Sequence, residues 1–381
     1  MKRIIVSGAL ANKLHNGGEA WVRLSWILGF QRLGFEVFFI EQLNPESCVD
    51  TAGTPVCFIQ SENLAYFKRV TKYYGLEQCS ALVCGEEIYG NSFLELTRIA
   101  DSSDLLINIS GHLTLDLKYR VRRRVFIDID PGYTQFWEAA GQSRTQFQGH
   151  DSYFTIGTNI GTPACSIPFA GIVWRATRQP VVLGLWPVVQ ERRRDFSTVA
   201  SWRGGYGTVT FDGTTYGQKA HEFRRFLELP KHSAQHFSLG LDIHIGDSKD
   251  LAALQQNGWE IDYARTVVET PWAFQDYIQS SAAEFSVAQG IYVDTNCGWF
   301  SDRSVRYLAS GKPVLLQETG FSDHIPTGQG IVPFKTFAQA VSGAESIMSN
   351  YEVHSRAARK LAETIFDSDI VLGELLEQLG K

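Results

Sequence analysis

The chain has 381 residues, which is long enough for two domains, and its 44% hydrophobic and 20% charged content is that of a globular protein. A formal net charge of −6 and the lack of a long basic block argue against nucleic acid as the main partner. No apolar run approaches the roughly 18–20 residues that span a bilayer, so we expect a cytoplasmic protein without a transmembrane segment.

The first residues, MKRIIVSGALANKL, superficially imitate a signal peptide, but the apolar run is short and is followed by polar residues and glycines. We therefore interpret this run as a first β-strand. The six cysteines, at positions 48, 57, 79, 84, 165 and 297, show no C-x-x-C spacing. We expect reduced thiols, with neither a disulfide framework nor a zinc site.

The first half of the chain alternates strands with helices. The apolar stretch RIIV, at 3–6, is typical of a strand in a parallel sheet covered on both faces. A helix with apolar residues at helical spacing is expected at 19–33, and the next strand at 36–43. Further strands are expected at 104–112 and 123–132. This alternation predicts a doubly wound sheet.

The second half repeats this pattern. We expect strands at 197–202, 238–246, 258–263, 285–293 and 312–319, and helices at 217–229, 250–258 and 302–311. From about residue 334 onward the pattern is helical. The sequence therefore predicts an α/β protein with two Rossmann-like, doubly wound parallel-sheet domains. Such domains would face each other across a cleft, where ligands of α/β folds bind.

We place a linker at residues 186–196, because the stretch around it contains two prolines and a run of arginines at 192–194. The N-terminal domain then covers residues 1–185 and the C-terminal domain residues 197–360. The final segment, 361–381, is expected to form a helix that packs back toward the N-terminal domain.

The first loop, at 7–21, is rich in glycine but contains neither a dinucleotide fingerprint nor a P-loop, because about nine residues separate Gly8 from Gly17. Without the fingerprint, we interpret Glu41 as an ordinary strand-end residue rather than a ribose ligand. Gly17 and Gly18 precede a helix and are candidates to offer bare amides to an anion. A flexible loop with a helix start is the alternative.

Three side chains are candidates for acid–base chemistry. Asp128 and Asp130 form a D-x-D on one face of a strand, a pattern that can hold a divalent metal or simply end a strand before a turn. Asp130, at the strand end, could orient or deprotonate a substrate hydroxyl. His112 and His15 titrate near neutral pH and could act as bases, with surface or capping roles as the alternative.

The stretch CGWFSDRSVRYLASGKPVLLQETGF, at 297–321, contains an unusual helix start. Ser301 or Asp302 is a good N-cap, but capping alone does not require hydroxyls at both 301 and 304 around Arg303. Free amides, the helix dipole, two hydroxyls and an arginine together favour an anion. We therefore predict a phosphate-binding helix start, which is compatible with capping.

These features resemble GT-B-fold glycosyltransferases. In that family a glycine-rich turn and a helix start bind the donor diphosphate, an A-x-G-x-P-V segment follows, and then a Gly-aliphatic-aliphatic-Pro strand. The corresponding residues here are 309–314 and 330–333. The glycine pair of the first loop and the stretch LGFEVFFIE, at 33–41, resemble the family's opening. The chain looks most similar to the bacterial glycosyltransferase family 4-like, CgeB-like group.

The resemblance implies a hexosyltransferase-type enzyme that moves a sugar from a nucleotide-diphosphate donor to a hydroxyl acceptor, either a small molecule or a glycan. It implies no cofactor beyond this co-substrate and no metal, with the acceptor on the N-terminal side. The implied diphosphate ligands are Ser301, Asp302, Arg303, Ser304, Lys219, Arg203, Gly17 and Gly18. The implied nucleoside and sugar contacts are Gly298, Trp299, Phe300, Thr319, Gly320 and Phe321.

The sequence departs from the family at one point. Many retaining members carry two glutamates eight positions apart, and the residues here are Gly298 and Arg306. The donor and the anomeric outcome are therefore open. Two alternatives also stay open: a sugar-nucleotide epimerase that uses Asp128 and Asp130 as an acid–base pair, and a non-catalytic protein that binds nucleotide sugars.

Overall fold

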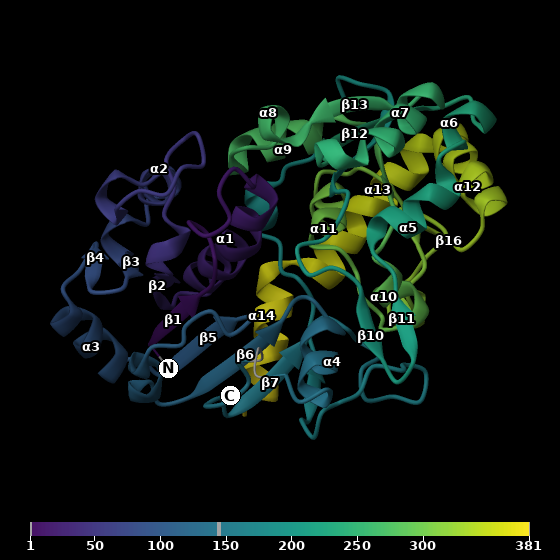
Figure 1. The fold of residues 1–381 in the computed structure, drawn as a ribbon. Helices are drawn as coiled ribbons and strands as arrows, with labels where there is room; N and C mark the ends of the chain where they lie inside the picture. Colours follow the sequence, from purple (N-terminus) through teal and green to yellow (C-terminus); the bar gives the residue numbers. More distant parts are fainter. Residues whose placement is uncertain (1, 143–145, 381) are drawn as a thin grey trace.

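Two mainly parallel β-sheets organise the chain, and the computed structural model describes residues 2–142 and 146–380. The first sheet has the strand order β4-β3-β2-β1-β5-β6-β7-β8, in which only the β3–β4 pair is antiparallel. Its strands are β1 (Arg3–Ser7), β2 (Glu36–Leu43), β3 (Ser80–Cys84), β4 (Glu87–Tyr89), β5 (Leu105–Ile109), β6 (Arg124–Asp128), β7 (Ser152–Thr155) and β8 (Trp174–Ala176). This is the purple-to-blue half of Figure 1.

The second sheet is wholly parallel and has the order β13-β12-β9-β14-β15-β16. Its strands are β9 (Asp195–Ser201), β12 (His236–Asp242), β13 (Glu260–Tyr263), β14 (Ala283–Ser286), β15 (Val314–Gln317) and β16 (Ile331–Phe334). A separate hairpin joins β10 (Val209–Phe211) to β11 (Thr214–Tyr216). Both sheets thus have the mixed α/β, parallel architecture that the sequence predicts.

Helices cover the faces of both sheets. Those of the first half are α1 (Gly17–Arg32), α2 (Glu62–Tyr73), α3 (Phe93–Asp101) and α4 (Tyr133–Ala139). Those that follow are α5 (Lys219–Phe223), α6 (Leu229–His232), α7 (Ser248–Gln256), α8 (Ala264–Val267), α9 (Pro271–Ser280), α10 (Gly290–Asp294), α11 (Asp302–Ala309), α12 (Phe337–Ser349), α13 (Tyr351–Leu361) and α14 (Ser368–Gln378). None of the helices in the described ranges is long and apolar enough to cross a membrane.

The central strands are buried along their whole length, as β5 shows with all five residues inaccessible. A near-continuous apolar run suits this position because helices cover both faces of the sheet. The prediction of a strand at 285–293 is wrong in its second half, because β14 ends at Ser286 and α10 begins at Gly290. Periodicity cannot separate a buried strand from the buried helix that directly follows it.

The predicted helix at 217–229 is also broken. α5 ends at Phe223 and a short 3₁₀ turn follows before α6, which has Pro230 in its first turn. Proline favours the start of a helix and disrupts its interior, so the chain restarts there.

The two halves share one apolar core. Trp21 of α1 lies 4.9 Å, ring centre to ring centre, from Trp186, and its indole N–H donates to the carbonyl of Pro271 at 2.7 Å. α14 returns to the first half and packs on α1, where Arg32 pairs with Asp369 at 2.9 Å. Figure 1 shows this yellow helix beside the blue strands.

The division into domains with a linker at 186–196 stays a prediction. Residues 1, 143–145 and 381 fall within the predicted domains but lie outside the described residues.

Candidate functional site

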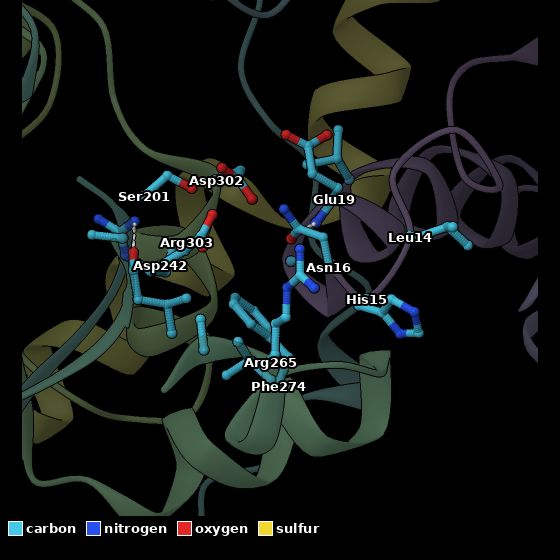
Figure 2. A pocket seen from close by; sticks show the side chains of 16 residues that line it. Leu14, His15, Asn16, Glu19, Ser201, Asp242, Arg265, Phe274, Asp302 and Arg303 are labelled. Atoms are coloured by element: carbon cyan, nitrogen blue, oxygen red, sulfur yellow. Dashed lines mark hydrogen bonds between the residues drawn. The ribbon is translucent and has the colours of Figure 1, made fainter. Parts of the chain in front are cut away.

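A cleft of about 240 Å³ lies between the two halves, where the carboxyl ends of β9 and β12 face the start of α1. Figure 2 shows the wall formed by the α1 start, with Glu19, and the wall formed by the α11 start, with Asp302. An adjoining cavity of about 470 Å³ shares Asp242, Ala264 and Arg265 with the cleft. Because α/β folds bind ligands at carboxyl strand ends, this cleft is the candidate site.

The start of α11 forms one edge of the cleft, but its two hydroxyls point elsewhere. Ser301 is the N-cap, and its Oγ accepts the backbone N–H of Arg303 at 3.2 Å. Ser301 and Ser304 are 3% and 0% exposed, and both line a space of only about 10 Å³ behind the cleft. The Ser304 hydroxyl faces the buried Glu284 carboxylate, whose pKa it helps to lower. Neither hydroxyl therefore reaches the cleft in this conformation.

Arg303 lines the cleft, but its guanidinium is already engaged. Nε donates to Glu284 Oε1 at 2.6 Å, and the two terminal nitrogens donate to the Val199 carbonyl at 2.7 Å and to Ser286 Oγ at 2.6 Å. The Glu284 side chain is completely buried; burial raises its pKa, and the charge of Arg303 opposes this rise. Arg303 thus ties α11 to β9 and β14, and leaves at most its remaining N–H groups for a ligand.

Lys219, the first residue of α5, is a buried cation without a direct partner; it lies near Arg303 and Asp302 but is not among the described residues that line the 240 Å³ cleft. It is 9% exposed, and among the described residues its ammonium makes no hydrogen bond or ion pair. Burial and the neighbouring charge of Arg303 lower the pKa of Lys219 to about 7, while Glu284 and Asp302 act in the opposite direction. An arriving anion would stabilise the charged form.

The remaining predicted cation, Arg203, is placed differently. Arg203 forms a bidentate ion pair with Asp247, at 2.5 and 2.9 Å, and lines the adjoining cavity. Arg265, which sequence reasoning did not single out, lies at the junction of the two cavities with no hydrogen bond or ion pair among the described residues. The free guanidinium in the cleft is therefore that of Arg265.

Gly17 and Gly18 are held against α9. The Gly17 N–H donates to the carbonyl of Val268 at 2.9 Å. A Cβ at Gly17 would lie 2.2 Å from the Thr270 carbonyl oxygen, and one at Gly18 would lie 3.0 Å from the Phe274 ring. Close packing between the halves thus explains the glycine pair, and Gly18 still lines the cleft.

The six predicted nucleoside and sugar contacts are not among the described residues that line the 240 Å³ cleft. Trp299 stacks on Tyr292 at 4.6 Å, and Phe300 packs between Phe321 and Phe366. The other three, Gly298, Thr319 and Gly320, lie at hydrogen-bonded turns, two of which contact the loop after β7. Their assignment stays a prediction that would require the cleft to rearrange.

Two of the predicted bases lie at neighbouring strand ends of the first sheet and are not among the described residues that line the 240 Å³ cleft. Asp130 follows β6 and His112 follows β5, and these strands are neighbours in the sheet. Burial, Glu19 and Asp128 raise the pKa of Asp130 to about 7, and the phenol of Tyr292 donates to its Oδ1 at 3.3 Å. Burial and then Arg23 lower the pKa of His112 to about 4. The surroundings thus bring the pKa of Asp130 close to neutral pH and favour the neutral form of His112.

An ion pair between a buried arginine and a partly exposed glutamate lies beside these two residues. Glu19 and Arg23 stand one helical turn apart on α1 and form a salt bridge. Arg23 is 1% exposed and lies directly over Gly8, where a Cβ would come within 3.1 Å of its side chain. The charges of both residues act on His112 and on Asp130. Close packing against the Arg23 side chain therefore explains the glycine at position 8.

Asp128 and His15 have structural partners. Asp128 is buried, and its Oδ2 accepts from Gln135 and Thr155, each at 2.7 Å. No group of three or more His, Cys, Asp or Glu side chains in the described ranges could hold a metal. His15 lines the cleft, and its Nδ1 lies 2.7 Å from Glu269 Oε1 across the junction of the halves.

Sequence reasoning missed the function of Glu41. Its carboxylate is buried and accepts three backbone N–H groups, from residues 10, 11 and 12, at 2.7–2.9 Å. It therefore fixes the first loop and is not an ordinary strand-end residue. Glu19 and Arg23 were also missed, although their i,i+4 spacing was visible. The sequence feature that could have drawn attention to Glu284 is an acidic residue inside an otherwise apolar strand.

Known proteins were compared with the sequence and with the structure. No model of a protein family matches the sequence, and no curated protein sequence matches it. Solved structures do match over the whole length. An α-glucosyltransferase (AGT) in complex with UDP has a TM-score of 0.59, with 11% identity and 100% of both chains covered. HepE of Anabaena, with UDP and glucose, has a TM-score of 0.57, with 10% identity over 100% of this chain and 99% of that one.

The chain has the GT-B glycosyltransferase fold. A third match, the sucrose-phosphate synthase of Thermosynechococcus elongatus, has a TM-score of 0.51, with 11% identity over 100% of this chain and 99% of that one. The matches support the predicted GT-B class, and the finer CgeB-like grouping stays a prediction. One solved form of AGT holds both UDP and a 13-mer DNA.

Proposed function

We propose that this chain is a glycosyltransferase that moves a sugar from a nucleotide-diphosphate donor to a hydroxyl acceptor. The observation that carries the proposal is Lys219, a buried ammonium without a direct partner beside the start of α11. A buried unpaired cation is costly and is typical of a functional site. Solved proteins of this fold are complexed with UDP, an anion of the kind that such a cation would bind.

The diphosphate would lie between Lys219, Arg265 and the first-turn amides of α11. Of the carboxylates on these walls, Asp302 pairs with Arg306 at 2.7 Å and Glu19 pairs with Arg23, whereas Asp242 has no ion pair among the described residues. The unpaired ammonium and guanidinium therefore provide the net attraction. Cations aimed at the leaving diphosphate stabilise the charge that develops as the sugar bond breaks, without a metal.

Asp130 is the preferred base in this proposal. A base is most effective when its pKa is near the working pH, and the pKa of Asp130 is about 7 while that of His112 is about 4. Asp130 would accept the proton of the acceptor hydroxyl as that oxygen attacks the sugar carbon. The epimerase alternative loses its acid–base pair, because Asp128 is enclosed by hydrogen bonds.

The test is a panel of nucleoside diphosphates, UDP, dTDP, GDP and ADP, titrated into the wild type and Lys219→Met while thermal stability is measured. A ligand that binds only the folded chain raises its melting temperature. We expect at least one nucleotide to stabilise the wild type and to have a much smaller effect on the variant. A control variant, Lys312→Arg, alters a buried lysine that is already bonded to the Val189 carbonyl and should respond like the wild type. The absence of any shift with the wild type would refute the proposal.

A further inference from the structure

Aromatic rings surround Asp130 on the side of the second half. Tyr133 and Trp137 of α4 lie 5.1 and 5.2 Å, ring centre to ring centre, from Tyr206 of the loop after β9. Tyr292 of α10 bonds Asp130 directly and lies 6.4 Å from Tyr133. The carboxylate thus sits beside a group of rings contributed by both halves.

Tyr206 is the exposed member of this group. The residue is 50% exposed, although burial, Asp130 and Glu19 raise the pKa of its phenol well above the usual range. The residue is therefore half exposed, while the charges of Asp130 and Glu19 act on its hydroxyl. It stands in the sequence RGGYG, at 203–207, and a Cβ at Gly205 would meet no atom within 4 Å.

The polar groups next to these rings have hydrogen-bonding capacity that is not used. Asp130 accepts one hydrogen bond from Tyr292 and one of its oxygens has no partner, while the His112 ring and the Lys13 ammonium have no hydrogen bonds among the described residues. These groups offer an acceptor, a neutral imidazole and a cation within a small area. A molecule with several adjacent hydroxyls and a C–H face would match both the polar groups and the rings.

We propose that the acceptor is a carbohydrate, whose ring stacks on Tyr206 and Trp137 and whose hydroxyls bond to Asp130 and His112. The negative face of an aromatic ring attracts the weakly positive C–H face of a sugar. This inference rests on the proposed function and names its acceptor class. A nucleic-acid acceptor fits less well, because these contacts provide two acids and no cluster of free cations for phosphates. An alkyl chain would leave the polar groups without partners.

The test measures saccharide binding directly, by saturation-transfer NMR with methyl glucoside, methyl galactoside, maltose and cellobiose. Phenol and 1-hexanol provide the non-sugar probes. We expect at least one saccharide to receive saturation, about tenfold weaker binding in Tyr206→Ala and in Trp137→Ala, and near-normal binding in Tyr206→Phe, which keeps the ring. Tyr119→Ala is the matched control, because Tyr119 is 51% exposed and lies beside Arg124, at the opposite end of β6.

UDP and GDP are titrated into each variant in parallel, so that loss of the acceptor site is distinguished from loss of the donor site. Saccharide binding that is unchanged by Tyr206→Ala would overturn the inference, and so would binding of phenol or hexanol but of no saccharide. If the wild type binds a nucleotide and no saccharide at all, the acceptor assignment fails and the donor proposal stands. If it binds a saccharide and no nucleotide, the donor proposal fails instead.

Discussion

Lys219→Met should make the unliganded protein more stable while abolishing donor binding. The pKa of Lys219 falls from 10.5 in the unfolded chain to about 7 in the folded one. Between these two values the unfolded chain binds more protons, so stability rises with pH across that window. Below pH 7 the penalty is fully present, and at about 1.4 kcal/mol per pH unit it is on the order of 3–5 kcal/mol.

Methionine fills most of the same volume without a charge and should therefore relieve this penalty. The advantage of the variant is expected to shrink by on the order of 2–3 kcal/mol between pH 7 and pH 9, because wild-type Lys219 loses its proton there. Urea unfolding followed by tryptophan fluorescence at several pH values measures both quantities. A matched variant, Lys312→Met, should be destabilised instead, because the Lys312 ammonium donates to the Val189 carbonyl at 2.8 Å and lies 3.8 Å from Glu191.

A variant less stable than the wild type at pH 6.5, or one whose stability difference does not vary with pH, would refute this reasoning. The same result would mean that Lys219 has a stable partner in the free protein, and the main support for a diphosphate site would be lost.

Four further variants, the last of them a control, test other features of the structure. Asp130→Asn should reduce the rate of sugar transfer by about 100-fold or more without changing nucleotide affinity. The wild-type rate should rise with pH through about 7, where Asp130 ionises. A rate that changes neither with this substitution nor with pH would exclude Asp130 as the base. Arg303→Met leaves Glu284 buried without its cation and should destabilise the protein by about 3–5 kcal/mol in urea unfolding, whereas a neutral effect would show that the pair is dispensable. Gly17→Ala should lower the melting temperature because its Cβ would clash with the Thr270 carbonyl, and Gly205→Ala, which meets no atom within 4 Å, should leave it nearly unchanged.

Local patterns were sufficient to predict most of the second sheet. α11 was expected at 302–311 and is found at Asp302–Ala309, because a capping serine, an apolar stripe and a terminal glycine are all encoded within a few residues. The same stretch did not reveal the ion pair that Arg303 forms. Its partner Glu284 lies on another strand, and one sequence does not reveal such a long-range pair.

Gly17 shows the same limit. A glycine before a helix favours an anion site when only its neighbours in the chain are considered. In the fold, α9 approaches from a part of the chain some 250 residues away, and its carbonyl at Thr270 takes the space of a side chain. Conversely, Asp130 and His112 could be selected because both follow buried strands that a parallel sheet places side by side.

The most direct test of the central claim is the fate of a labelled donor. The purified chain is incubated with nucleotide sugars labelled in the sugar, with and without the saccharides named above, and nucleotides and glycans are then separated. The account predicts that label enters a saccharide as an equal amount of nucleoside diphosphate is released, and that Lys219→Met does neither. A nucleotide sugar that binds but never releases its diphosphate with any acceptor would contradict the account, and so would a sugar that is interconverted while still attached to its nucleotide.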